Sequence, residues 1–169
     1  MVARDLLGRV LWMGRPGDDL ALRITETEAY LAVDDRASHS FRGPTARNAP
    51  MFGPPGRAYV YLIYGIHHCL NAVTEAEGVG AAVLIRGVEG VRGPGLVCRA
   101  YGLNLSHNGL DLSTSELRIL PGAPVPDTDV LTGPRVGITR SAHLPLRFRW
   151  AAHVPRPRRA RTAPQPPEE

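Results

Sequence analysis

The feature that most constrains the fold is an alternation of apolar and polar residues over residues 20–31. One set of alternate positions is apolar as far as Ile24, and this period of two predicts a β-strand with one buried face. If the strand stays regular, Glu26, Glu28 and Tyr30 lie on that face. A carboxylate there should have a raised pKa, from desolvation and from its like-charged neighbour. A raised pKa is what a general base needs to work near neutral pH.

The rest of the chain has the composition of a sheet protein with many connections, including eighteen glycines and sixteen prolines. Residues 34–57 are irregular, and a connection of that length is unusual in a compact domain unless it is functional. In the first half we expect a short helix running into a strand over 3–13, a turn at 15–19 and a hairpin over 58–73 that turns at Gly65. In the second half we expect a buried central strand over 80–88, a short helix within 94–105 and a turn at 107–112. The last strands are expected within 130–138 and 144–150. Strands and helices do not alternate as βαβ units. The predicted fold class is therefore α+β, a single domain on a curved, mostly antiparallel sheet with flanking helices and a protruding β-hairpin.

One domain over residues 1–153 accounts for the folded part. Residues 154–169 are rich in Pro and Arg and poor in apolar side chains, so we expect a disordered tail. Cys69 and Cys98 lie too far apart in sequence for a CxxC pair, which favours two buried reduced thiols. No segment is long and apolar enough to span a membrane, and the first residues lack a secretory core. We therefore expect a cytoplasmic protein.

The chain has no lysine, and all twenty of its basic residues are arginine. A Schiff-base enzyme needs an amine nucleophile, which here only the N-terminal amine can supply. A Walker-type phosphate loop needs its lysine and is excluded. The net charge of +4 and the pI near 9.6 favour a polyanionic partner without identifying it.

Residues 26–71 combine groups that a hydrophobic core does not explain, because Glu is almost never fully buried unless it is paired. The stretch contains both glutamates of the predicted strand, His39, and four of the five tyrosines. Aromatic side chains can stack on a flat ring, and a flat ring bound by a basic protein indicates a nucleobase. Tyr64 at the hairpin tip suits a wedge that fills the gap left when a base leaves the duplex.

At these residues the chain resembles the alkyladenine (3-methyladenine) DNA glycosylase family of vertebrates and many bacteria. The matching motifs are Glu26-Thr27-Glu28-Ala29-Tyr30, the run from His39 to Thr45, Arg47-Asn48, Met51-Phe52, Tyr59-Val60-Tyr61 and Tyr64-Gly65. The resemblance is close over residues 4–90 and looser through 93–95, 108–112 and 134–138. Several long motifs in register are far more specific than one short motif.

The resemblance implies roles for individual residues. Glu28 would be the base that activates water for attack at C1′ of the sugar, and Arg86 and the Val136 carbonyl would help to hold that water. The remaining roles would fall to Tyr30, His39 and Tyr61 as walls of the base pocket, Asn71 as a gate against the exocyclic amine of normal guanine, Tyr64 as the wedge in the minor groove, and Arg42, Arg47 and Met51 at the DNA backbone.

The resemblance also implies a substrate and a reaction. We expect double-stranded DNA that contains alkylated or deaminated purines of the 3-methyladenine, 7-methylguanine and hypoxanthine class. Since there is no lysine, water is the nucleophile, and a monofunctional enzyme without lyase activity leaves an abasic site. We expect no metal, no other cofactor, a monomer, and a nucleoid-associated place in the cytoplasm.

Several residues in the block have a simpler structural interpretation. Glu26 is expected to be a sheet-edge or hydrogen-bonded structural carboxylate rather than a second catalyst, and Tyr59 a core residue. His67, His68 and Cys69 do not favour zinc, because adjacent side chains on a strand point in opposite directions.

Departures from the family pattern leave other functions open. The chain is shorter between Arg86 and Gly93, and its C-terminal part diverges. One alternative is therefore a nucleic-acid-binding protein of the same fold with impaired catalysis. Another is a hydrolase that uses Glu26 and Glu28 on a different substrate, such as a glycoside. Two such neighbours on a strand lie only about 7 Å apart, which disfavours that reading. Release of free purine from methylated duplex DNA distinguishes the three.

Overall fold

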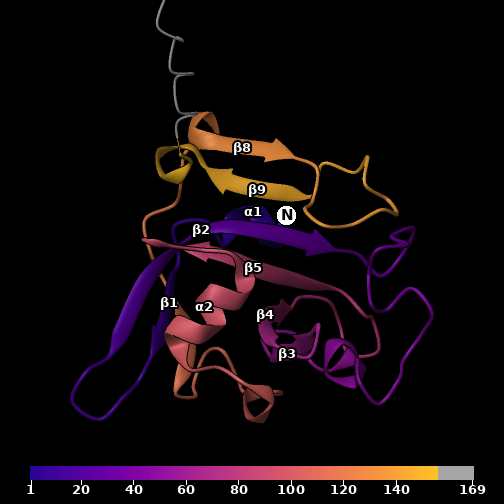
Figure 1. The fold of residues 1–169 in the computed structure, drawn as a ribbon, viewed down its shortest axis with the longest axis horizontal. Helices are drawn as coiled ribbons and strands as arrows, with labels where there is room; N and C mark the ends of the chain where they lie inside the picture. Colours follow the sequence, from indigo (N-terminus) through magenta and orange to yellow (C-terminus); the bar gives the residue numbers. More distant parts are fainter. Residues whose placement is uncertain (156–169) are drawn as a thin grey trace, which may run out of the picture.

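Strand β2 is the central strand of a curved antiparallel sheet, and the fold confirms the predicted α+β class (Figure 1). The computed structural model describes residues 1–155, so most of the predicted tail, residues 156–169, lies outside the described residues. Within residues 1–155, nine strands form one sheet, and every pair of neighbouring strands is antiparallel. The strands are β1 (Val10–Met13), β2 (Leu20–Tyr30), β3 (Ala58–Ile63), β4 (His67–Val73), β5 (Ala82–Val88), β6 (Val91–Arg92), β7 (Leu117–Leu120), β8 (Val130–Gly133) and β9 (Arg147–Trp150).

The length of β2 lets it pair with three other strands. β5 pairs with its second half along one edge, while β1 and β9 divide the other edge between them. The pairing with β5 shifts register between Ile24 and Glu26 and again between Glu26 and Thr27. Such bulges re-aim side chains. The regular face predicted for this strand is therefore interrupted: Ile24 joins the main core, whereas Glu26 and Glu28 both reach Arg86.

The helices are short, and one of them covers the main core. Helix α1 (Val2–Asp5) opens the chain, and α2 (Pro94–Tyr101) packs against β4 and β5. The Tyr101 hydroxyl donates a hydrogen bond to the carbonyl oxygen of Leu11, 2.7 Å away. The two cysteines are free and buried, as the sequence predicts. The 3₁₀ turns are Ala49–Phe52, Leu105–His107, Asp127–Asp129 and Ala151–His153.

The connection from β2 to β3 is irregular, as predicted, but polar side chains fix its course. Asn48 is buried; its Oδ1 accepts from the backbone N–H of Thr45, and its Nδ2 donates to the carbonyl of His39. The connection also packs closely on Gly80, where a Cβ would lie 2.5 Å from the Cβ of Ser40. Glycine is therefore the residue that allows this close approach. The connection runs at one end of β2 and β5, beside β3 and β4 (Figure 1).

Some predicted elements are shorter than expected. Of the region 130–138 only Val130–Gly133 is a strand, because Pro134 has no N–H to donate to a ladder and Gly137 has a left-handed φ of 74°. The last strand is confined to Arg147–Trp150. The strands β6 and β7 were not predicted. In the part of the chain that the structure describes, no helix is long and apolar enough to cross a membrane.

Candidate active site

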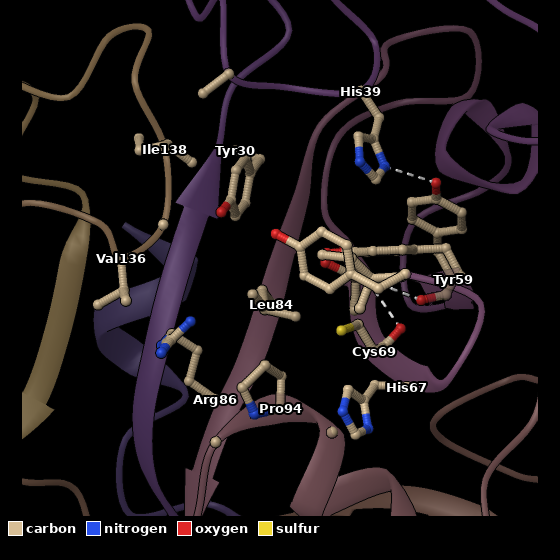
Figure 2. A pocket seen from close by; sticks show the side chains of 18 of the residues that line it. Tyr30, His39, Tyr59, His67, Cys69, Leu84, Arg86, Pro94, Val136 and Ile138 are labelled. Atoms are coloured by element: carbon tan, nitrogen blue, oxygen red, sulfur yellow. Dashed lines mark hydrogen bonds between the residues drawn. The ribbon is translucent and has the colours of Figure 1, made fainter.

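A cavity of about 490 Å³ opens between the end of β2 and the β3–β4 hairpin (Figure 2). Ligand pockets for small molecules fall in this size range. Tyr30, Val136 and Ile138 lie on one side of it, and His39 and Tyr59 lie on the other. Arg86 and Pro94 lie toward one end. The aromatic and aliphatic lining, with a few polar groups, suits a flat heterocycle.

Glu28 lies directly behind the cavity wall and is completely buried. Its Oε1 accepts a hydrogen bond from the Val136 amide at 2.8 Å, and its Oε2 accepts one from the Tyr30 hydroxyl at 3.0 Å. The Nε of Arg86 is 3.4 Å from Oε1. All three partners line the cavity, so the carboxylate is coupled to the cavity through its wall rather than exposed in it.

Burial raises the pKa of Glu28 above its ordinary value, and the charge of Arg86 and the Val136 and Tyr30 hydrogen bonds oppose that rise. The direction confirms the expectation from the sequence. The expected cause was only half right, because the charge of the neighbouring Glu26 is neutralised. Oε1 of Glu26 accepts from Nε of Arg86 at 2.9 Å and from Nε of Arg147 at 2.7 Å. Glu26 is thus a hydrogen-bonded structural carboxylate, as predicted.

A buried ion pair holds the groups that hold Glu28. Arg135 and Asp35 are both fully buried in their side chains, and they meet in two parallel bonds of 2.5 and 2.7 Å. Arg135 also donates to the Ala29 carbonyl at 2.9 Å, and its Cζ lies 4.6 Å from the ring centre of Tyr30. Arg135 directly precedes Val136 in the chain. One guanidinium therefore supports two of the three partners of the Glu28 carboxylate, Tyr30 and Val136.

The same pair orders the start of the long connection. Burial would raise the pKa of Asp35, but the Arg135 bonds and charge and two backbone N–H donors outweigh it, so the pKa is lowered. The donors are the amides of Leu31 and Ala37. The carboxylate is thus kept charged opposite Arg135.

The opposite wall is made of neutral aromatic rings. His39 and Tyr61 meet edge to face with their centres 4.5 Å apart, and Tyr59 lies 5.6 Å from Tyr61. Nδ1 of His39 is 2.9 Å from the Tyr59 hydroxyl, a bond drawn in Figure 2. Burial and the charge of Arg47 lower the pKa of His39, and burial raises the pKa of Tyr59 to about 12. At neutral pH this wall therefore has no charge.

With this geometry established, sequence comparisons place the chain among known proteins. A family profile described as Methylpurine-DNA glycosylase (MPG) matches residues 1–92 and 89–154. The chain belongs to the methylpurine-DNA glycosylase family. The two matched stretches meet at residues 89–92, within the interval where the sequence is shorter than the family pattern.

Several relatives are similar in sequence to this protein over most of its chain. The chain is 50% identical over 147 residues to a protein of Myxococcus xanthus, across 82% of this chain and 76% of the relative. It is 52% identical over 169 residues to one of Anaeromyxobacter dehalogenans, across 92% and 81%. It is 43% identical over 166 residues to one of Nitrosospira multiformis, across 87% and 82%. Each is named "Putative 3-methyladenine DNA glycosylase". The family and these names together support a DNA glycosylase function.

The residues that the glycosylase resemblance selects are mostly brought together. Tyr30, His39, Tyr61, Arg86 and Val136 line the one cavity, and Glu28 lies behind its wall. Contact with Glu28 comes from the Val136 amide, whereas the expected role concerned the Val136 carbonyl, which stays a prediction. Tyr64 lies at the cavity rim, 84% exposed.

The hairpin tip has an unusual backbone. Tyr64 has a φ of 54° and Gly65 one of 69°, as in the central positions of a type I′ turn. Positive φ is uncommon for a residue with a side chain and is found chiefly where function or packing enforces it. Ile66, next in the turn, is 73% exposed. The tip thus presents two large apolar side chains to solvent.

Other selected residues differ in their settings. Arg42 and Arg47 are exposed, as a phosphate contact requires, and Arg47 also donates to the Leu62 carbonyl at 2.7 Å. Met51 is 2% exposed and lines the cavity. Its predicted contact with the DNA backbone stays a prediction. Asn71 is buried, and its Nδ2 donates to the Tyr59 and Cys69 carbonyls, which leaves Oδ1 for a ligand.

Sequence reasoning missed three supports of the candidate site. Tyr59 is buried as predicted, but it also lines the cavity. Asp35 gave no signal, and Arg135 stood in the matched stretch 134–138 without an assigned role, because only the fold reveals that residues a hundred positions apart form one pair. Within residues 1–155, no group of three or more His, Cys, Asp or Glu residues is arranged to hold a metal ion.

Proposed function

We propose that this protein is a monofunctional DNA glycosylase that flips alkylated or deaminated purines out of the duplex and excises them with water. The observation that carries the proposal is the buried Glu28, which three cavity-lining residues hold behind a recess of aromatic rings. A carboxylate with a raised pKa beside such a recess is what a general base for a base-excising reaction needs.

In the proposed reaction, Glu28 takes a proton from a water molecule whose oxygen attacks C1′ of the flipped nucleotide. The bond from C1′ to the purine nitrogen breaks, its electron pair leaves with the purine, and an abasic site results. Arg86 and the Val136 carbonyl are proposed to position the water. The chain has no lysine to form a Schiff base with the abasic sugar, so strand cleavage should not follow.

The neutral wall supports the choice of substrate class. Many alkylated purines carry positive charge, which weakens the glycosidic bond. The faces of aromatic rings attract a desolvated cation by about 2 kcal/mol. Damaged bases also leave the stack at lower cost than normal bases. We propose that Tyr64 fills the gap in the minor groove and that Asn71 excludes normal guanine.

The decisive experiment is single-turnover release of purine from duplexes that each contain one lesion, with wild type and Glu28→Gln. We expect the variant to release base roughly 10²–10⁴-fold more slowly. Its affinity for a duplex with an abasic-site analogue should not change. A panel of 3-methyladenine, 7-methylguanine, hypoxanthine and etheno-adenine gives the lesion preference.

Glu116→Gln is a matched control, because Glu116 is exposed and precedes β7, at the end of the β3–β4–β5–β2–β1–β7 strand order. If Glu28→Gln releases base at the wild-type rate, Glu28 is not the general base. Binding of damaged duplex by the wild type without release would favour a binding protein over an enzyme.

A further inference from the structure

A second cleft, of about 60 Å³, lies beside the cavity and is rich in arginine. Arg147 and Arg149 of β9 stand opposite Glu28 and Glu26 of β2 in the antiparallel pairing. Directly opposed residues project from the same face of a sheet. Arg92 lines both the cavity and the cleft, so the two are adjacent.

The cleft has more positive charge than its own residues neutralise. Among the described residues that line the cleft, Glu26 is the one with an acidic side chain. Its Oε1 already accepts hydrogen bonds from both Arg86 and Arg147. Arg92 donates to the carbonyl of His153. Within residues 1–155, the Arg149 guanidinium makes no hydrogen bond or ion pair, and its Nε is buried without a partner.

A partly buried, unpaired guanidinium is costly for a free protein. Its planar fork of N–H donors matches the oxygens of a phosphate, and such charge-assisted pairs are the strong ones. The cleft therefore has the charge, the unused donors and the position of an anion site next to a nucleobase site.

We propose that this cleft, formed by Arg92, Arg147, Arg149 and His153, binds one phosphate of the DNA strand that carries the flipped nucleotide. The proposal rests on the proposed function, since it supplies the phosphate that accompanies a base in the cavity. Arg149 makes the direct contact, and Arg92 connects the phosphate site to the base site.

The test compares wild type with Arg149→Gln in binding to a duplex that carries an abasic-site analogue, over a series of salt concentrations. Each phosphate contact steepens the dependence of log affinity on log salt by about one unit. We expect Arg149→Gln to have a shallower slope by about one, while Arg149→Lys keeps most of it. The melting temperature without DNA should not fall in Arg149→Gln, because residues 1–155 give this charge no hydrogen-bond or ion-pair partner.

Arg15→Gln is the matched control, since it removes one positive charge from the turn between β1 and β2, beyond the other end of β2. Its slope should equal that of the wild type. An Arg149→Gln slope equal to the wild-type slope would overturn the proposal. The proposal would also be overturned if the slope is unchanged while inorganic phosphate raises the melting temperature of the wild type but not of Arg149→Gln. The ligand of the cleft would then be free phosphate.

The outcomes also separate this proposal from the catalytic one. Base release by the wild type with an unchanged slope in Arg149→Gln would overturn the phosphate site alone. A reduced slope without any base release would retain the phosphate site and overturn the proposed reaction.

Discussion

The two walls of the cavity handle charge in opposite ways. The wall at the end of β2 carries Glu28, Arg86 and Arg135, and nearly every charge on it is paired. The wall formed by the hairpin and the long connection carries His39, Tyr59 and Tyr61, and it is uncharged at neutral pH. One wall is built by ion pairs and the other by ring packing.

This difference assigns a task to each wall. Paired charges in a buried setting are rigid, because moving one leaves another without a partner. They suit a group that must hold a fixed position, such as a general base. Uncharged rings bind by shape and by the electrons of their faces, so they suit a base that must enter and leave.

The largest effect should come from breaking the paired wall at its deepest point. Asp35→Asn leaves Arg135 buried without its counter-charge, which typically costs about 3–5 kcal/mol. We expect a large fall in the melting temperature and a loss of base release, because Tyr30 and Val136 lose their common support. Asp34→Asn is the control, since Asp34 is adjacent and exposed, and its positive φ of 58° is tolerated by Asn.

The pair also predicts a pH dependence. The folded pKa of Asp35 is lowered, so its contribution to stability is present above the unfolded pKa and is lost as pH falls through the folded one. The Asp35→Asn destabilisation should therefore shrink in acid. A constant difference in melting temperature at all pH values would contradict the ion-pair account.

The uncharged wall is tested by removing one ring. Tyr61→Leu keeps an apolar side chain but removes the aromatic face, and base–aromatic stacking contributes about 1–3 kcal/mol. We expect release of cationic 7-methylguanine to fall more than release of neutral hypoxanthine, measured at single turnover. Tyr101→Phe is a control, because Tyr101 is the last residue of α2, packs in the main core and does not line the cavity. Equal losses for the two lesions would show that Tyr61 contributes shape alone.

The protein should be less stable with the charged carboxylate of Glu28 than with the neutral amide of glutamine at the same position. Its folded pKa is raised, so folding stability falls as pH rises from the unfolded pKa through the folded one. Glu28→Gln removes that cost and should raise the melting temperature at neutral pH by about 2–4 °C, equivalent to about 1 kcal/mol. The gain should vanish in acid, where the carboxyl of the wild type is protonated. A variant less stable than the wild type at neutral pH would sink this prediction.

The sequence predicts the uncharged wall better than the paired one. The hairpin follows from alternating β-formers around Tyr64-Gly65, and its wall residues Tyr59 and Tyr61 occupy alternate positions on one strand. Local patterns of this kind are visible without coordinates. Glu28 could be selected as well, since it ends an apolar alternation and stands within a long family motif.

The supports of the paired wall could not be predicted. Arg135 and Asp35 are ordinary surface residues by composition, and only the return of the chain beside β2 brings them together. The bulges around Glu26 lie where the pairing of β2 passes from β1 to β9, a place that only the fold defines. Local sequence patterns do not reveal such contacts between residues that are far apart in the chain.

The smallest expected effect concerns the hairpin tip, where the uncharged wall meets solvent. Tyr64→Asn replaces a residue strained at positive φ with one that tolerates it, so the free energy of unfolding should rise slightly, by less than about 1 kcal/mol, and the melting temperature with it. Ile66→Asn at the same tip is the matched control, because Ile66 does not have a positive φ and the change relieves no strain. If Tyr64 is the wedge, Tyr64→Asn should also weaken binding to a flipped lesion more than binding to undamaged duplex. If the variant is more stable but its lesion preference is unchanged, Tyr64 is not the wedge. The positive φ of Tyr64 then follows from the geometry of the turn alone.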